Sequence, residues 1–271
     1  MRQILVVASV NHDCIWQLEQ PIVSGRRLRV REKKLVLGGG GFYTGTALLD
    51  LGAAVALVSR LRRDELGLAA LRTLNDIGFQ TRHVELVDGE TKPLDILIDP
   101  NGERTILAPL RVGDAPVRIA DAAPSAAAYI NALHLDTALL DVLSQTPLVM
   151  SQLPLNPATS RPADYVISSL DDIGGDIPRA WKRAVDVAGS RLKSLVVTNG
   201  PDPIVIHDGV SSRQIAASRV DDMCNTLGAG DHFAGALLHA LLNGLALAEA
   251  VRAAADDTAT WLERRRARDS T

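Results

Sequence analysis

The alternation of short apolar runs with longer amphipathic ones restricts the fold of this chain more than any other feature. The first run, residues 3–10, has the character of a central parallel strand covered on both faces. Similar strand patterns follow at residues 53–59, 81–87, 126–133, 147–152, 164–169 and 195–198, and helical patterns at 64–77, 177–191, from 230 onwards and at 247–263. This order predicts an α/β fold, in which helices cover both faces of a mostly parallel sheet. No Pro/Gly/Ser-rich linker divides residues 1–271, which indicates a single domain.

Composition narrows the kind of partner. Hydrophobic residues make up 46% of the chain and aromatic residues only 3%, so we expect an aliphatic core and no base-stacking surface. The net charge of −3 gives no basic excess for nucleic acid, and the arginine-rich residues 264–268 are expected to form a solvated, frayed tail. No apolar segment is long enough to span a membrane. Cys14 and Cys224 lack metal-site spacing, so we expect a reduced, cytoplasmic protein that binds a small molecule.

Two segments differ from the rest because charged and apolar residues alternate in them. They cover residues 22–36 and 92–107, the second with a turn signal at 100–103. Such alternation is typical of strands with one face in water. If the two segments pair, they form a small β sheet outside the main core. This sheet, made of about residues 12–36 and 91–108, would serve as a lid. Two independent surface hairpins are the alternative.

Three small residues open the helical pattern near residue 230. Gly228, Ala229 and Gly230 carry almost no side-chain bulk, so their N–H groups can approach a ligand closely. The N-terminus of the following helix adds roughly half a positive charge at the same point. Together these groups predict a site for a phosphate group.

Asp231 follows these residues directly, although a carboxylate beside a phosphate site repels the ligand. Its position makes sense if it takes a proton from a hydroxyl group that attacks the phosphate. Two simpler interpretations stay open. An acid in the first turn interacts favourably with the helix dipole, and Gly-Ala-Gly is also common in tight turns and close contacts.

Polar residues follow the first predicted strand. Asn11 and Asp13 come after residues 3–10, and ligands of open α/β sheets bind at the carboxyl ends of strands. These two side chains are therefore candidates for binding hydroxyl groups. An Asx-type turn that leaves the strand is the alternative.

Four glycines at residues 38–41 precede a second helical pattern. The Walker motif fails here because Thr46 stands where its lysine is required. The dinucleotide fingerprint fails because Thr44 or Tyr43 occupies the place of its third glycine. We therefore expect this loop to pack its backbone against a neutral ligand.

These pieces, taken in order, resemble one family over nearly the whole chain. Residues 225–238 are similar to the carboxyl-terminal signature of the ribokinase-like (PfkB) carbohydrate kinases, and residues 38–52 with 55–60 to the amino-terminal one. Asn11 and Asp13 fall where that family binds sugar hydroxyls. The resemblance implies a three-layer α/β/α fold with a small β lid, and a homodimer formed through that lid.

The resemblance also implies an ATP-dependent kinase that phosphorylates a hydroxyl of a sugar, sugar derivative or nucleoside. ATP would lie near Thr198 and Gly200, with Asn225 in the same nucleotide region and Asp256 near the adenine. The amides of residues 228–230 would stabilise the transferred phosphoryl group, and Asp231 would be the base. The acceptor would contact Asn11, Asp13, Gly39, Gly40 and Tyr43.

Three positions depart from the family pattern. Asn225 replaces an aspartate of a monovalent-cation site, which speaks against potassium activation, and Tyr43 replaces an asparagine, which favours a nucleoside or modified sugar. The asparagine and glutamate that organise Mg²⁺ become Ser169 and Asp172, which would then be the metal residues here. These departures leave one alternative function, a catalytically weak regulatory protein that binds a sugar or nucleotide.

Overall fold

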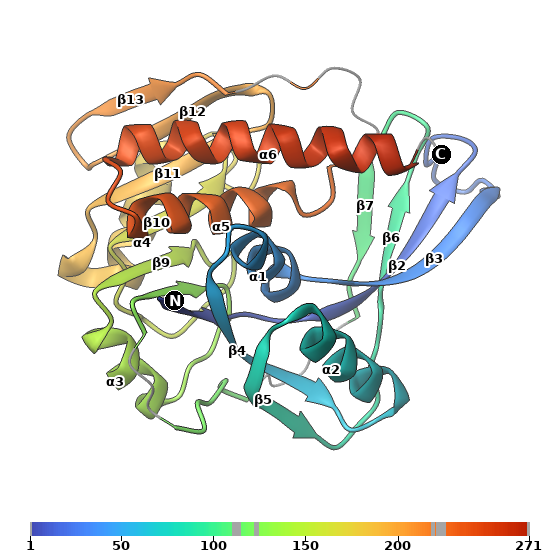
Figure 1. The fold of residues 1–271 in the computed structure, drawn as a ribbon. Helices are drawn as coiled ribbons and strands as arrows, with labels where there is room; N and C mark the ends of the chain where they lie inside the picture. Colours follow the sequence, from blue (N-terminus) through green and yellow to red (C-terminus); the bar gives the residue numbers. More distant parts are fainter. Residues whose placement is uncertain (1, 110–114, 122–124, 218–219, 221–225, 270–271) are drawn as a thin grey trace.

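A nine-stranded sheet forms the centre of the molecule (Figure 1). The computed structural model describes residues 2–109, 115–121, 125–217, 220 and 226–269. From one edge, the strands are β5 (Gln80–Val87), β4 (Ala54–Arg62), β1 (Gln3–Val7), β8 (Ala127–Ile130), β9 (Leu148–Gln152), β10 (Tyr165–Ser169), β11 (Ser194–Asn199), β12 (Asp202–His207) and β13 (Ser212–Ile215). Neighbours are parallel from β5 to β11, and β12 and β13 add an antiparallel edge. The predicted mostly parallel sheet is confirmed.

Helices cover both faces of this sheet because side chains alternate along each buried strand. Ile4 and Val6 of β1 pack in one cluster with α1 (Gly40–Asp50), α2 (Glu65–Ile77), α5 (Ala229–Leu242) and α6 (Leu247–Asp269). Leu5 and Val7 pack on the other face with α3 (Thr137–Gln145) and α4 (Ile177–Ala188). The fold is therefore the expected three-layer α/β/α arrangement. None of the described helices is both long and apolar enough to cross a membrane.

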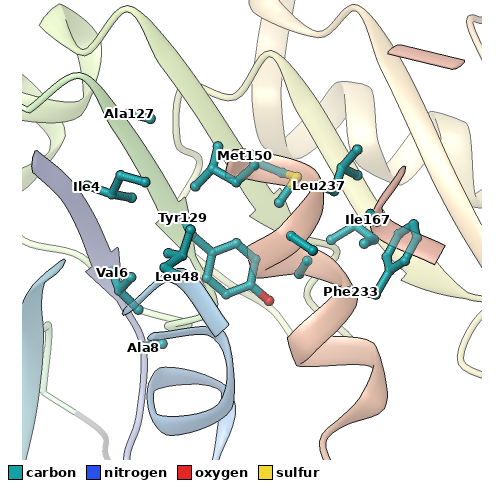
Figure 2. Close-up of a cluster of buried hydrophobic side chains, with 14 of the residues drawn as sticks. Ile4, Val6, Ala8, Leu48, Ala127, Tyr129, Met150, Ile167, Phe233 and Leu237 are labelled. Atoms are coloured by element: carbon teal, nitrogen blue, oxygen red, sulfur yellow. The ribbon is translucent and has the colours of Figure 1, made fainter. Parts of the chain in front are cut away.

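The core between the sheet and α5 is aliphatic except for a few rings. Figure 2 shows Tyr129 of β8 reaching across from the strands towards the helices. Its side chain is fully buried, beside Leu48 of α1 and Phe233 of α5. Burial of aliphatic area on this scale is the main stabilising term for a domain of this size.

A second, four-stranded sheet lies beside the main one (Figure 1). Its strand order is β3 (Val30–Gly38), β2 (Asn11–Leu18), β6 (Leu94–Ile98) and β7 (Arg104–Leu107). β2 pairs parallel with β6, whereas β3 and β7 pair antiparallel with their neighbours. The two alternating segments thus lie in one sheet rather than in two separate hairpins.

Two local expectations were wrong. The first strand ends at Val7, and residues 11–13 already lie in β2 instead of in a turn after the strand. The arginine-rich residues 264–268 do not form a frayed tail, because α6 continues through them to Asp269. Arg265 is held there by contacts with Leu227 and Trp261.

Candidate active site

The glycines before α1 leave room for two polar side chains of β2. A Cβ atom at Gly38 would lie 1.8 Å from the Asp13 Oδ2 atom. Gly39 has a positive φ of 84°, and a Cβ there would lie 2.7 Å from the Ser9 carbonyl oxygen and 3.0 Å from Asn11 Nδ2. Glycine fits at these two positions because it has no Cβ atom. The backbone of Gly38 and Gly39 can therefore lie directly against the side chains of Asp13 and Asn11.

Gly40 leaves room for two more polar groups, from distant parts of the chain. A Cβ at Gly40 would lie 2.3 Å from Asn131 Nδ2 and 3.0 Å from Asp231 Oδ1. Asn131 directly follows β8, and Asp231 lies in the first turn of α5. The glycine run is therefore the point at which β2, β8 and α5 bring their polar side chains together.

Both carboxyl groups at this point hold their protons more tightly than usual. Burial raises the pKa of Asp13 to about 6. Burial, with the charge of Asp13 added, raises the pKa of Asp231 to about 6. Asp13 Oδ1 is buried and forms no hydrogen bond with any described residue. A hydroxyl group of a ligand is the kind of donor that such an oxygen requires.

Helix α5 begins beside these acids with a left-handed residue, Gly228, at φ 83°. The N–H group of Ala229 is not available, because it donates to the Thr226 carbonyl oxygen at 3.1 Å. Within the described part of the chain, the N–H groups of Gly230 and Asp231 have no acceptor. Among the described residues, only Ala229 is therefore excluded from the three amides expected from the sequence, and the Asp231 amide joins those of Gly228 and Gly230 at the helix N-terminus.

Asp231 is held in place by a contact with α1. The Thr44 hydroxyl of α1 donates to the Asp231 carbonyl oxygen at 3.0 Å. Burial raises the pKa of the Tyr129 phenol well above its usual value, and the charge of Asp231 adds to this effect. The half-buried Asp231 therefore carries its charge close enough to the apolar core to act on the Tyr129 phenol.

Tyr43 packs beneath the anion turn and offers little surface to a ligand. Its side chain is buried, and a Cβ at Gly228 would lie 2.6 Å from its ring. Tyr43 also joins a small apolar cluster with Leu227, Ile15 and Ile96, which links the second sheet to the turn. Its position is thus mainly one of support for Gly228.

A cavity of about 890 Å³ opens next to this point. It lies at the carboxyl ends of β1, β4, β5 and β8, as expected for an open α/β sheet. Asn11 and Asn131 line it, whereas Asp13 and Asp231 are not among its lining residues. Several charged or titratable residues also line it: His12, Arg60, Arg62, Glu85, Glu90, Lys92, Arg118 and His134. Asn131 connects the cavity with Asp231 across Gly40.

Comparisons with known proteins agree with this architecture. Residues 169–270 match the model of the pfkB family carbohydrate kinases. A ribokinase of Haemophilus influenzae is 25% identical over 276 residues, covering 93% of this chain and 90% of that protein.

Two solved structures share the fold. The ribokinase of Cryptococcus neoformans var. grubii serotype A in complex with ADP has a TM-score of 0.74 at 18% identity, covering 97% of this chain and 94% of that one. The Burkholderia thailandensis nucleoside kinase in complex with inosine has a TM-score of 0.72 at 18% identity, covering 96% and 91%.

The chain thus matches the pfkB carbohydrate kinase model over residues 169–270 and is similar to ribokinases over nearly its whole length. These matches identify it as a phosphotransferase that acts on an alcohol group. In this protein, the cluster at the glycine run and the N-terminus of α5 lie at the same end of the sheet.

The residues expected to bind the nucleotide lie apart from the glycine run. Thr198 is the penultimate residue of β11 and its hydroxyl donates to the Ser168 carbonyl oxygen at 3.3 Å, and Gly200 directly follows the strand with φ 53°. Asp256 is exposed on α6. Asn225 lies outside the described residues. The structure therefore places Thr198 and Gly200 at the end of one strand and Asp256 on a separate helix.

The expected metal residues of the kinase form a turn. The Ser169 hydroxyl accepts the Asp172 N–H group at 3.1 Å, which leaves the Asp172 carboxylate exposed. The described residues contain no group of three metal-binding side chains. This donor set fits Mg²⁺ only in its usual nucleotide-bound form, with one protein carboxylate, phosphate oxygens and water.

Sequence reasoning missed Asn131 and Arg265. Asn131 had a usable signal, because it directly follows the apolar residues 127–130 and the rule applied to Asn11 extends to it. Arg265 had no such signal, because its bond to the Leu227 carbonyl oxygen joins residues that are far apart in the sequence.

Proposed function

We propose that this PfkB kinase transfers the γ-phosphoryl group of ATP to a hydroxyl group that lies between Asp231 and the N-terminus of α5. The observation that carries this proposal is the convergence of Asp231, Asn131 and Asp13 on the backbone of residues 38–40. A general base, hydroxyl-binding groups and an anion site are thus within reach of one small ligand.

Asp231 is suited to act as general base. With a pKa of about 6, it is mostly ionised at neutral pH but accepts a proton more readily than an ordinary aspartate. The acceptor hydroxyl would pass its proton to an Asp231 carboxylate oxygen as its own oxygen attacks the phosphorus atom. Asp13, through its unpartnered Oδ1, and Asn11 would hold other hydroxyl groups of the acceptor.

The N–H groups of Gly230 and Asp231 would stabilise the charge on the transferred phosphoryl group. One such donor contributes about 3 kcal/mol in comparable sites. Thr198 and Gly200 are our candidates for contacts with the nucleotide, and Asp172, with Ser169 beside it, for holding Mg²⁺. The metal would neutralise phosphate charge.

The acceptor we favour is a nucleoside or a modified sugar. Tyr43 fills the place of a small amide with an apolar ring, which removes one hydroxyl-binding group. The cavity of about 890 Å³ is large enough for a nucleoside. We also infer that the enzyme works in the cytoplasm, where ATP is available.

A coupled assay of ADP release over pentoses, hexoses, sugar acids and nucleosides tests the proposal. We expect one class to be turned over, and Asp231→Asn to lower kcat on that substrate by a factor on the order of 10²–10⁴. Binding of a sugar or nucleoside without any ATP turnover would instead support a regulatory binding protein.

A further inference from the structure

One face of α6 packs against α5 and against the turn that precedes α5. Asp257, Trp261 and Arg265 are spaced by four residues and so share this face. His232 of α5 lies against it, with its Nε2 atom 2.8 Å from Asp257 Oδ2 and its ring stacked on Trp261 at 4.7 Å between centroids. The Arg265 guanidinium lies 5.2 Å from the centre of the Trp261 ring. The side chain of Arg265 is therefore ordered by an aromatic contact.

The guanidinium of Arg265 reaches the anion turn itself. It donates to the carbonyl oxygen of Leu227 at 2.5 Å, one residue before Gly228. Leu227 is buried, so this is a charge-assisted bond in a water-poor place, and such bonds are about twice as strong as neutral ones. The bond fixes the peptide that leads into the left-handed residue Gly228.

The same guanidinium faces Tyr43 on α1. Burial raises the pKa of the Tyr43 phenol, and the charge of Arg265 and a side-chain hydrogen bond with it act in the opposite direction. The Tyr43 ring in turn rests against Gly228. One side chain at the end of α6 thus contacts both supports of the anion turn, its preceding carbonyl group and the ring beneath it.

We propose that Arg265 is a positioning residue for phosphoryl transfer, which fixes the Gly228–Asp231 turn by holding the Leu227 carbonyl group and the Tyr43 phenol at once. The inference rests on the proposed role of that turn. Arg265 contacts neither substrate directly and acts through Leu227 and Tyr43. A planar guanidinium can bond two oxygens in a fixed geometry, which the single ammonium group of lysine does not reproduce.

The test compares Arg265→Met with Arg264→Met. Arg264 is exposed on the same helix, so its variant removes the same charge without touching the turn. We expect Arg265→Met to lower kcat by about 10- to 100-fold, because small misplacements of catalytic groups cost this much. The KM values for ATP and acceptor should change little, and Arg264→Met should match the parent enzyme.

Two further variants separate positioning from simple stability. Arg265→Lys keeps the charge and should fold, yet recover only part of kcat. In a Tyr43→Phe background, Arg265→Met should cost less than in the parent enzyme, because one of its two partners is already lost.

Equal kcat values for Arg265→Met and Arg264→Met would overturn the inference. So would full activity of Arg265→Lys, or a loss of activity that merely follows the fraction of unfolded protein. If the parent enzyme turns over no acceptor, the proposed function itself fails, and that result is distinct from these.

Discussion

At the scale of single residues, the site is built around two aspartates, Asp13 and Asp231, whose pKa values burial raises. Asp13 is almost fully buried, and both Asp13 and Asp231 have a pKa of about 6. The same burial that makes Asp231 a better base makes the ionised site costly for the folded protein. We therefore expect function and stability to conflict at these two positions.

Asp13→Asn should stabilise the protein at pH 8. A carboxyl group whose pKa is raised on folding binds its proton more tightly in the native state, so its cost grows between about pH 4 and 6 and is complete above pH 6. The shift from 3.8 to about 6 corresponds to at most about 3 kcal/mol. Thermal unfolding at pH 8 and at pH 4 measures this effect.

The higher melting temperature of Asp13→Asn should be present at pH 8 and absent at pH 4. Asp202→Asn, at an exposed carboxylate, is the control and should change little at either pH. An equal change at both pH values would show that the effect is not one of ionisation.

At the scale of elements, local patterns predict most of the structure. Helix α2 shows why, because Asp64 caps it by accepting the Gly67 N–H group and Gly78 ends it in the left-handed region at φ 111°. These signals lie within the segment itself. The apolar runs of the main strands are equally local, since each depends only on burial of both faces.

The elements that were mispredicted depend on distant partners. Residues 11–13 continue into β2 because β3 and β6 pair with them, and no local pattern shows this. The end of α6 is ordered because Arg265 meets Leu227 and Trp261. Local patterns therefore gave Asp231, Asn11 and Asp13 as separate candidates, and only the family resemblance implied that they meet around one acceptor beside Gly39 and Gly40.

One buried ion pair joins three strands of the main sheet, and its loss should be costly. The Asp164 carboxylate, before β10, accepts the Val149 N–H group of β9 and bonds Arg191 and Lys193, before β11. Asp164→Ala should destabilise the protein by about 3–5 kcal/mol, because it leaves Arg191 without its buried partner. Urea unfolding measures this difference.

Lys193→Ala is the matched control for this pair. Its side chain is 61% exposed, so we expect a loss below about 1 kcal/mol. Burial alone would raise the pKa of Asp164, but its bonds to Arg191, Val149 and Lys193 lower it on balance. This stabilisation should therefore be lost only as the pH falls below about 4. Similar losses for both variants at pH 7 would contradict the account.

At the scale of the whole molecule, the second sheet contacts the site and also exposes apolar side chains. Ile15 and Ile96 of this sheet pack with Leu227 and Tyr43, beneath the anion turn. Four apolar residues of its two edge strands are more than 40% exposed: Val30, Leu35, Ile106 and Leu107. We propose that this sheet serves as a lid and as a homodimer interface.

A dimer through the lid should dissociate when its apolar surface becomes charged. We expect light scattering to give the parent enzyme a mass near twice 28.9 kDa, and Ile106→Asp with Leu107→Asp to give one monomer mass. Val210→Asp is the control, because Val210 is 95% exposed in the distant turn between β12 and β13. A parent enzyme that is monomeric, or a double variant that stays dimeric, would refute the interface.

The role of Asp231 as base is tested most directly by the single-turnover rate of phosphoryl transfer in Asp231→Asn. A single turnover excludes product release, and calorimetry shows in parallel whether the acceptor still binds. We predict a rate lower by a factor on the order of 10²–10⁴, with binding of the acceptor retained. A single-turnover rate equal to that of the parent enzyme would contradict the account.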